Sequence, residues 1–156
     1  SIEILWPDDY DQEFQSLGGD GSPENNRSVV ALVSLPDRKL LITGDIEPEV
    51  QAILRRDFDL SSVDILKVPH HGSRFQDEAF LTEISPEIAL VSVGEGNSYG
   101  HPNPELLSSL ARDGARVLRT DHDGPISVAW RFDDSAGRYI FTTRAMRKEW
   151  WRVQWR

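Results

Sequence analysis

His70 and His71 are two of the chain's four histidines, and they stand side by side shortly after an apolar run, DILKV. Gly72 and Ser73 follow them, as in a loop that turns. Imidazole is the commonest metal ligand and binding residues concentrate on loops, so this pair predicts a functional site. Neighbouring side chains on extended backbone point in opposite directions. Unless the loop turns sharply, we expect His71 to bind a metal ion and His70 to contact a phosphate.

Two other strand-like segments also end in polar residues. Residues 40–43 lead into Asp45, and residues 87–93 lead into a glycine-rich loop that contains Asn97 and His101. In open α/β sheets, ligand sites form beyond the carboxyl ends of the strands. We therefore expect these two loops and the histidine pair to share one metal-competent site.

Asp45 has two interpretations. Aspartate is a preferred residue at a helix N-cap, but Pro48 suits the first helical position, which places the cap at Glu47. A carboxylate that is not needed as a cap can bridge two divalent ions, because each of its oxygens can hold one. We therefore interpret Asp45 as a metal ligand.

Other polar residues have roles that the sequence leaves open. Ser73 can donate to an anionic oxygen or cap the next turn. Pro102 restricts His101 to extended conformations, so its ring either faces the site or caps the following helix. The segment 121–123, DHD, looks like a metal cluster, but it precedes a glycine, and Asp-Gly is a hairpin signal. There we expect a turn with an exposed His122.

Composition limits the classes of protein that remain. The chain has 156 residues, 38% hydrophobic and 28% charged, which predicts one globular domain. Its net charge is −9, whereas proteins that bind nucleic acid by neutralising phosphates are usually basic. A metal ion or a neighbouring domain must then supply positive charge at any nucleic-acid site. The chain has no cysteine, which excludes disulfides and thiolate zinc sites.

The hydrophobic pattern predicts an α/β fold. From residue 45 onward, helical and strand-like segments alternate, which indicates helices packed on a sheet, and antiparallel pairs at both ends make that sheet mixed. The expected strands span residues 2–6, 28–35, 40–43, 63–68, 87–93, 115–118, 126–132 and 138–143, and the expected helices span 48–57, 77–84 and a segment that begins at Pro104. No run approaches the ~20 apolar residues of a membrane helix, and no signal peptide is expected.

The order of four motifs resembles a known family. LLITGD, LKVPHHGS, IALVSVGEGNSYGHPNPELL and GARVLRTDHDG occur in this order over residues 29–128. This order resembles the C-terminal half of the metallo-β-lactamase-like domain of the ComEC competence proteins, which are bacterial membrane proteins of DNA uptake. The resemblance implies an αββα sandwich with helices on one face of a mixed sheet, two divalent ions (zinc or manganese), and phosphodiester hydrolysis that degrades one DNA strand.

The resemblance also implies roles for individual residues. Asp45 matches the family's bridging aspartate, and His70-His71 matches the histidine motif that completes the second metal. Ser73, Asn97 and His101 match polar positions near the site. The family's first ligand cluster, His-x-His-x-Asp-His, is absent, since no histidine precedes the pair.

We therefore expect residues 1–156 to be a partial domain that binds metal weakly or not at all and is inactive alone. Within it we expect a strand and loop at 1–27, an α/β core at 28–145, and a basic tail at 146–156. The implied partners are single-stranded DNA, the N-terminal half of the domain, and a membrane channel in the same polypeptide. The implied location is the extracytoplasmic side of a bacterial inner membrane. A sheet face built to be covered also predicts self-association.

Two alternatives stay open. One is a non-catalytic binding module, in which the acidic body and the tail tryptophans, Trp150, Trp151 and Trp155, contact a protein or membrane surface. The other is an unrelated phosphate-ester or lactone hydrolase on the same fold, because a fold does not determine its substrate.

Overall fold

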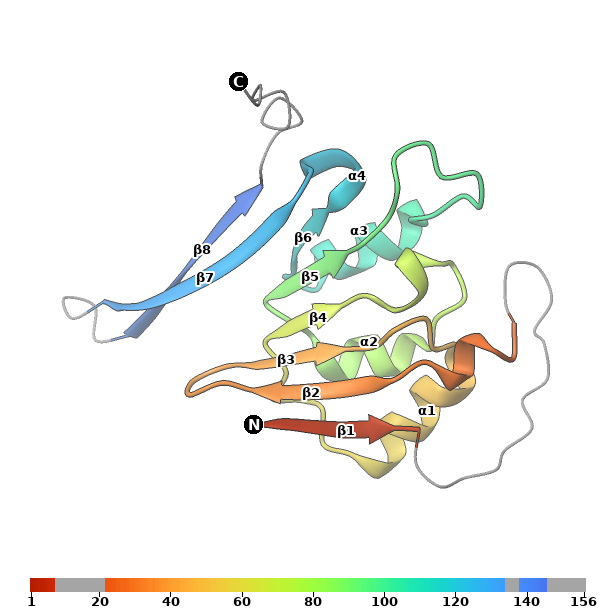
Figure 1. Ribbon diagram of the computed structural model, residues 1–156, viewed down its shortest axis with the longest axis horizontal. Coiled ribbons are helices and arrows are strands. Elements are labelled where there is room, and N and C mark those ends of the chain that lie inside the picture. Colours follow the sequence, from red (N-terminus) through yellow and green to blue (C-terminus); the bar gives the residue numbers. More distant parts are fainter. Residues whose placement is uncertain (8–21, 134–137, 146–156) are drawn as a thin grey trace, which may run out of the picture.

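A computed structural model of the protein describes residues 1–7, 22–133 and 138–145; from residue 130 onward it describes the backbone alone. A mixed six-stranded sheet carries helices on one face, and a separate two-stranded ribbon follows it (Figure 1). The elements, in chain order, are β1 (Ile2–Trp6), η1 (Asn25–Arg27), β2 (Val30–Ser34), β3 (Lys39–Ile42), α1 (Pro48–Asp57), β4 (Ile65–Lys67), η2 (Pro69–Gly72), α2 (Glu78–Ile84), β5 (Ile88–Val91), α3 (Pro104–Arg112), β6 (Arg116–Arg119), α4 (Thr120–Asp123), β7 (Ile126–Asp133) and β8 (Arg138–Ala145).

The strand order across the large sheet is β1-β2-β3-β4-β5-β6. The first three strands pair antiparallel, and β3 to β6 pair parallel. A helix connects each parallel pair, as parallel connections require. The mixed α/β sheet is therefore confirmed.

The helix starts follow the predicted signals. Pro48 lies in the first turn of α1 with Glu47 at the N-cap, as predicted, so Asp45 lies outside the helix. Asp77 caps α2 by accepting from the Ala79 amide. Among the described residues, no helix combines the length and the apolar character that crossing a bilayer requires.

The segment after β6 is a turn, as predicted, and this turn is helical. Residues 120–123 form the single helical turn α4, with Gly124 beyond it at φ +72°. This turn leads from the large sheet to the β7–β8 ribbon, so it does not close a hairpin between β6 and β7. The side chain of His122 is 78% exposed, as expected. Most of the loop expected within residues 1–27 falls on residues 8–21, and the expected basic tail is residues 146–156. Both segments lie outside the described residues.

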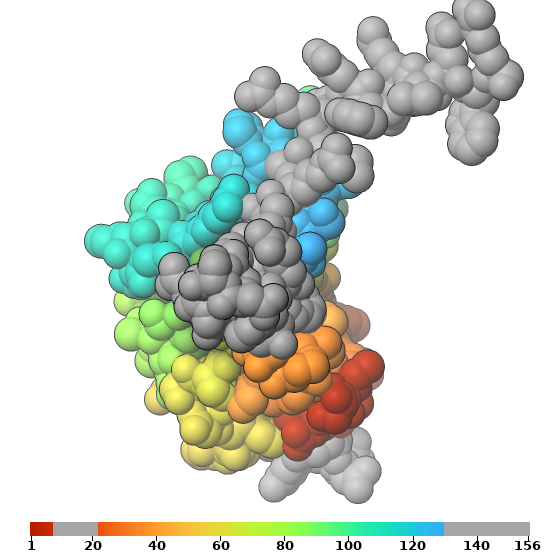
Figure 2. Space-filling view, turned by 90° about the vertical axis from the view of Figure 1, so that its left-hand side faces the viewer, coloured from red at the N-terminus to blue at the C-terminus, as the bar shows by residue number. Residues whose placement is uncertain are grey.

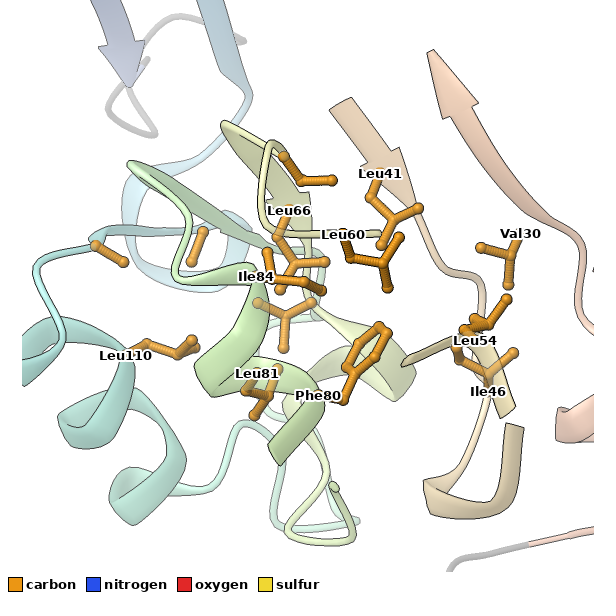
Figure 3. Close-up of a cluster of buried hydrophobic side chains, with 14 of the residues drawn as sticks. Val30, Leu41, Ile46, Leu54, Leu60, Leu66, Phe80, Leu81, Ile84 and Leu110 are labelled. Atoms are coloured by element: carbon orange, nitrogen blue, oxygen red, sulfur yellow. The ribbon is translucent and has the colours of Figure 1, made fainter. Parts of the chain in front are cut away.

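The main core lies between the helices and one face of the sheet (Figure 3). Phe80 from α2 is fully buried beside strand residues such as Leu41 and Leu66. Packing on this layer fixes the positions of β3, β4 and β5 and therefore the positions of their carboxyl ends.

The opposite face of the sheet is also apolar. Ile65, Ile88 and Leu118 form a second cluster there, packed against Ile126 and Val128 of β7. At the far end of this face, the β1 and β3 isoleucines are exposed; Ile2, Ile4 and Ile42 are 70%, 56% and 40% exposed. Figure 2 shows the helix layer, yellow to teal, on one side and the red and orange strands β1–β3 on the other.

Candidate active site

Three loops meet at the carboxyl ends of β3, β4 and β5, along one edge of the sheet (Figure 1). Asp45 follows β3, the turn η2 follows β4, and His101 follows β5. His71 Nε2 lies 3.5 Å from Asp45 Oδ2. The ring centroids of His70 and His101 are 5.3 Å apart. The structure thus brings together the predicted aspartate and the three predicted histidines.

A tight backbone turn delivers Asp45 to this edge. Gly44 has φ +56°, and a Cβ atom on it would lie 2.5 Å from Ser28 Cβ. The Asp45 amide donates to Ser28 Oγ at 3.0 Å. The Gly44 carbonyl accepts from the His70 amide at 3.2 Å, which ties the β3 loop to the histidine loop.

Lys67 is a site residue that the sequence analysis did not single out. Its ammonium donates to the Gly44 carbonyl at 2.7 Å and lies 3.6 Å from Asp45 Oδ1. Burial lowers the pKa of Lys67, and the nearby Asp45 carboxylate partly opposes this shift. The available signal was a lysine at the end of an otherwise apolar strand. Lys67 holds the aspartate in place and partly balances its charge.

The histidine loop turns sharply. His70 and His71 have φ values of +45° and +53°, a left-handed conformation that is uncommon outside glycine. Gly72 follows at φ +80°, and a Cβ atom on it would lie 2.7 Å from Pro102 Cβ. The Asn103 amide donates to the Gly72 carbonyl at 2.8 Å. The loops after β4 and β5 are therefore packed directly on each other.

His71 has a defined tautomer when its ring is neutral. Its Nδ1 lies 2.6 Å from the Ser92 carbonyl oxygen, which can only accept, so Nδ1 carries the proton. Nε2 then presents a lone pair toward the Asp45 carboxylate. A metal-binding histidine commonly donates its other ring N–H to such a carbonyl. Two ligands of one tetrahedral zinc, each about 2.0–2.1 Å from it, are about 3.4 Å apart, close to the 3.5 Å found here.

The other predicted residues shape the loops around this pair. Ser73 is fully buried, and its hydroxyl accepts from the Phe75 amide at 3.2 Å, which is a turn-capping contact. Asn97 Oδ1 accepts from the Tyr99 amide at 2.8 Å. Tyr99 is 74% exposed and stacks on His101 at 6.3 Å between centroids.

The helix α3 does not use His101 as its cap. Asn103 is the cap, and its side chain accepts from the Leu106 amide at 2.9 Å. The ring of His101 instead lies beside His70 and Tyr99. Of the two open interpretations for His101, the structure therefore favours the one in which the ring faces the site.

The donor set fits part of one metal-binding site. Within residues 1–7, 22–133 and 138–145, no group of three or more His, Cys, Asp or Glu side chains could hold a metal ion. Asp45 and His71 supply two donors with suitable spacing and tautomer. A zinc site usually has three or four protein ligands, so this pair matches two positions on such an ion.

Comparison with known proteins gives sequence relatives, although no protein-family model matches the chain. The chain is 35% identical over 121 residues to ComE operon protein 3 of Bacillus subtilis (strain 168), covering 77% of this chain and 15% of that protein. It is 32% identical over 106 residues to Recombination protein 2 of Haemophilus influenzae, covering 67% and 13%. It is 29% identical over 141 residues to Uncharacterized protein YcaI of Escherichia coli (strain K12), covering 89% and 18%.

The chain therefore spans less than a fifth of the length of these curated relatives. It is homologous to one segment of ComE operon protein 3 and Recombination protein 2, and this similarity supports the competence-protein family that its motif order indicates.

Proposed function

We propose that this chain is part of a metal-dependent phosphodiesterase domain that acts on DNA in a competence protein. The observation that carries the proposal is the Asp45–His71 pair, whose Nε2 and Oδ2 atoms lie 3.5 Å apart. When the ring is neutral, the bond to the Ser92 carbonyl keeps the proton on Nδ1, so Nε2 presents a lone pair to the carboxylate. Two groups that repel each other in this way are stabilised by a cation between them. The similarity to ComE operon protein 3 and Recombination protein 2 supports a role in DNA uptake, and the proposal therefore takes DNA as the substrate.

Asp45 and the three histidines at the carboxyl ends of the strands each have a role in this proposal. When bound, two divalent ions, zinc or manganese, would activate water and neutralise phosphate charge. Asp45 would hold both ions through its two oxygens, and His71 would hold one through Nε2. His70 and His101 line the adjacent side, where the substrate binds. Positive charge at the site also offsets the repulsion between DNA and a chain with net charge −9.

The missing ligands belong to another part of the polypeptide in this proposal. The relatives are several times longer than this chain. A preceding segment that carries the His-x-His-x-Asp-His cluster would complete the site and cover the second sheet face. The same longer protein would place the domain on the extracytoplasmic side of the inner membrane beside a DNA channel.

We expect this chain on its own to bind zinc weakly. A four-ligand zinc site in a peptide is worth about 10–16 kcal/mol, so two ligands supply roughly half, which corresponds to a Kd of about 1–200 μM. Isothermal titration checks this value. His71→Ala should remove the heat of binding, and His122→Ala, which changes an exposed histidine outside the site, should keep it. Two tight sites in the unmodified chain would contradict the proposal.

We also expect the isolated chain to self-associate through the apolar sheet face. Burying about 600 Å² of apolar surface releases roughly 15 kcal/mol in gross transfer terms, and Ile2, Ile4 and Ile42 leave that face partly exposed. Ile4→Lys should move the chain toward monomer in sedimentation experiments. Thr82→Lys on the exposed side of α2 is the matched control and should change nothing. A monomeric unmodified chain at high concentration would refute this expectation.

A further inference from the structure

We propose that Glu47 is a positioning residue for His70: its buried carboxylate fixes the ring so that Nδ1 carries the proton and Nε2 is the acceptor nitrogen. The orientation of the ring follows from contacts within this chain. What Nε2 then accepts rests on the proposed function.

The Glu47 side chain is rigidly held although it does not cap its helix. It is 1% exposed and makes no capping hydrogen bond in α1. Instead, Oε1 accepts from the Ser22 amide at 2.8 Å and from Asn25 Nδ2 at 2.7 Å. The Glu47 amide donates to Asn26 Oδ1 at 2.7 Å. The segment around η1 therefore fixes the carboxylate inside the protein.

His70 lies on the other side of this carboxylate. Its side chain is 10% exposed, and within the described part of the chain its Nδ1 is buried without a hydrogen-bond partner. The nearest approach to Glu47 is 3.8 Å, from Nδ1 to Oε1. The left-handed turn at His70 (φ +45°) and the bond from its amide to the Gly44 carbonyl aim the ring in this direction.

The charge of the carboxylate selects one tautomer. A lone pair on Nδ1 would face the carboxylate and be repelled, whereas an N–H at Nδ1 is attracted to it. At 3.8 Å this approach is longer than a hydrogen bond, and a ring movement of roughly 0.6–1 Å would bring Nδ1 within hydrogen-bond distance of Oε1. Both donors that the described residues supply to Oε1 are neutral amides, so neither of them forms an ion pair with the carboxylate.

This assignment changes what His70 can do. With the proton on Nδ1, the neutral ring presents a lone pair at Nε2, so it accepts a proton or binds a cation and does not donate to a phosphate oxygen. His101, whose ring centroid lies 5.3 Å away, is then the histidine that remains for the phosphate.

The tautomer of His70 tests the proposal directly. In ¹⁵N-histidine-labelled protein at a pH where the rings are neutral, long-range ¹H–¹⁵N spectra should show His70 protonated at Nδ1. Glu47→Gln keeps the shape of the side chain and removes its charge. It should shift the tautomer ratio about tenfold toward Nε2–H, because a tenfold change corresponds to about 1.4 kcal/mol, close to the contribution of a hydrogen bond to a charged group. Glu49→Gln is the control. The Glu49 carboxylate accepts from Asn26 Nδ2 at 3.3 Å, so this substitution removes a nearby negative charge and leaves the Glu47–His70 contact in place. It should not change the tautomer ratio.

Other outcomes also decide the question. His71 is an internal reference, since the Ser92 carbonyl should keep its Nδ1 protonated in every variant. An Nε2–H tautomer of His70 in the unmodified protein would overturn the proposal even if Glu47→Gln does not fold. A lower melting temperature in Glu47→Gln with an unchanged tautomer ratio would show a structural role alone. None of these spectra depends on metal or hydrolysis, so failure of the proposed function would be seen separately.

Discussion

Replacing Asp45 with alanine is expected to lower metal-dependent hydrolysis of single-stranded DNA at least about 100-fold in the longer protein that our proposal requires. Asp45 is the carboxylate that faces His71 at 3.5 Å, and in our proposal it touches both ions. Metal ions contribute several kcal/mol of transition-state stabilisation, and each 1.36 kcal/mol is tenfold in rate. Initial rates on a labelled oligonucleotide, measured with added zinc or manganese, give the change.

Asp121→Ala is the matched control for this substitution. Asp121 is also an acidic residue just after a parallel strand, but its carboxylate pairs with Arg119 at 2.6 Å instead of facing a histidine. Its loss should leave the rate within about twofold, because partly exposed ion pairs contribute little. Full activity of the Asp45→Ala variant would show that Asp45 is not a metal ligand. Activity on a lactone but not on DNA would favour the alternative hydrolase.

Gly44→Ala is expected to destabilise the fold by about 2–5 kcal/mol. The new Cβ would lie 2.5 Å from Ser28 Cβ, and the residue would have to keep φ +56°. Overpacking costs about 1–3 kcal/mol, and a left-handed conformation costs a non-glycine residue about 1–2 kcal/mol. At this chain length the change corresponds to a melting temperature roughly 4–20 °C lower, which calorimetry can measure.

Gly96→Ala separates the cost of the close approach to Ser28 from the cost of a positive φ. Gly96 also has a positive φ, +71°, but a Cβ atom there would meet nothing within 4 Å. Its substitution should therefore cost only the conformational part, about 1–2 kcal/mol. Ser28→Gly removes the atoms that clash at position 44, so the double variant should regain part of the stability. Equal losses at positions 44 and 96 would show that the close approach to Ser28 does not matter.

The framework of the site could be predicted from local sequence. Proline at position 48 marked the start of α1, so Asp45 could be placed outside the helix before the structure was seen. Apolar runs marked β3, β4 and β5. Because parallel strands end at the same edge of a sheet, the loops after them had to be neighbours, and the structure places Asp45 beside the histidines.

The contacts that set the detailed geometry could not be predicted in this way. Lys67 reaches the Gly44 carbonyl from 23 positions along the chain, and Glu47 approaches His70 across a similar separation. Such contacts depend on the backbone turns at positive φ, which hydrophobic periodicity does not show. The turn at DHD was predicted, but the Asp-Gly signal does not show which strands pair, and the strands on either side of this turn belong to different sheets.

The bond that aligns His71 comes from the backbone of Ser92, while the Ser92 side chain is exposed. Every amino acid, proline included, provides the same carbonyl oxygen. Substitution of Ser92 should therefore leave the imidazole aligned. Random mutagenesis at position 92 should return a broad range of tolerated residues, whereas our proposal expects His71 to tolerate few.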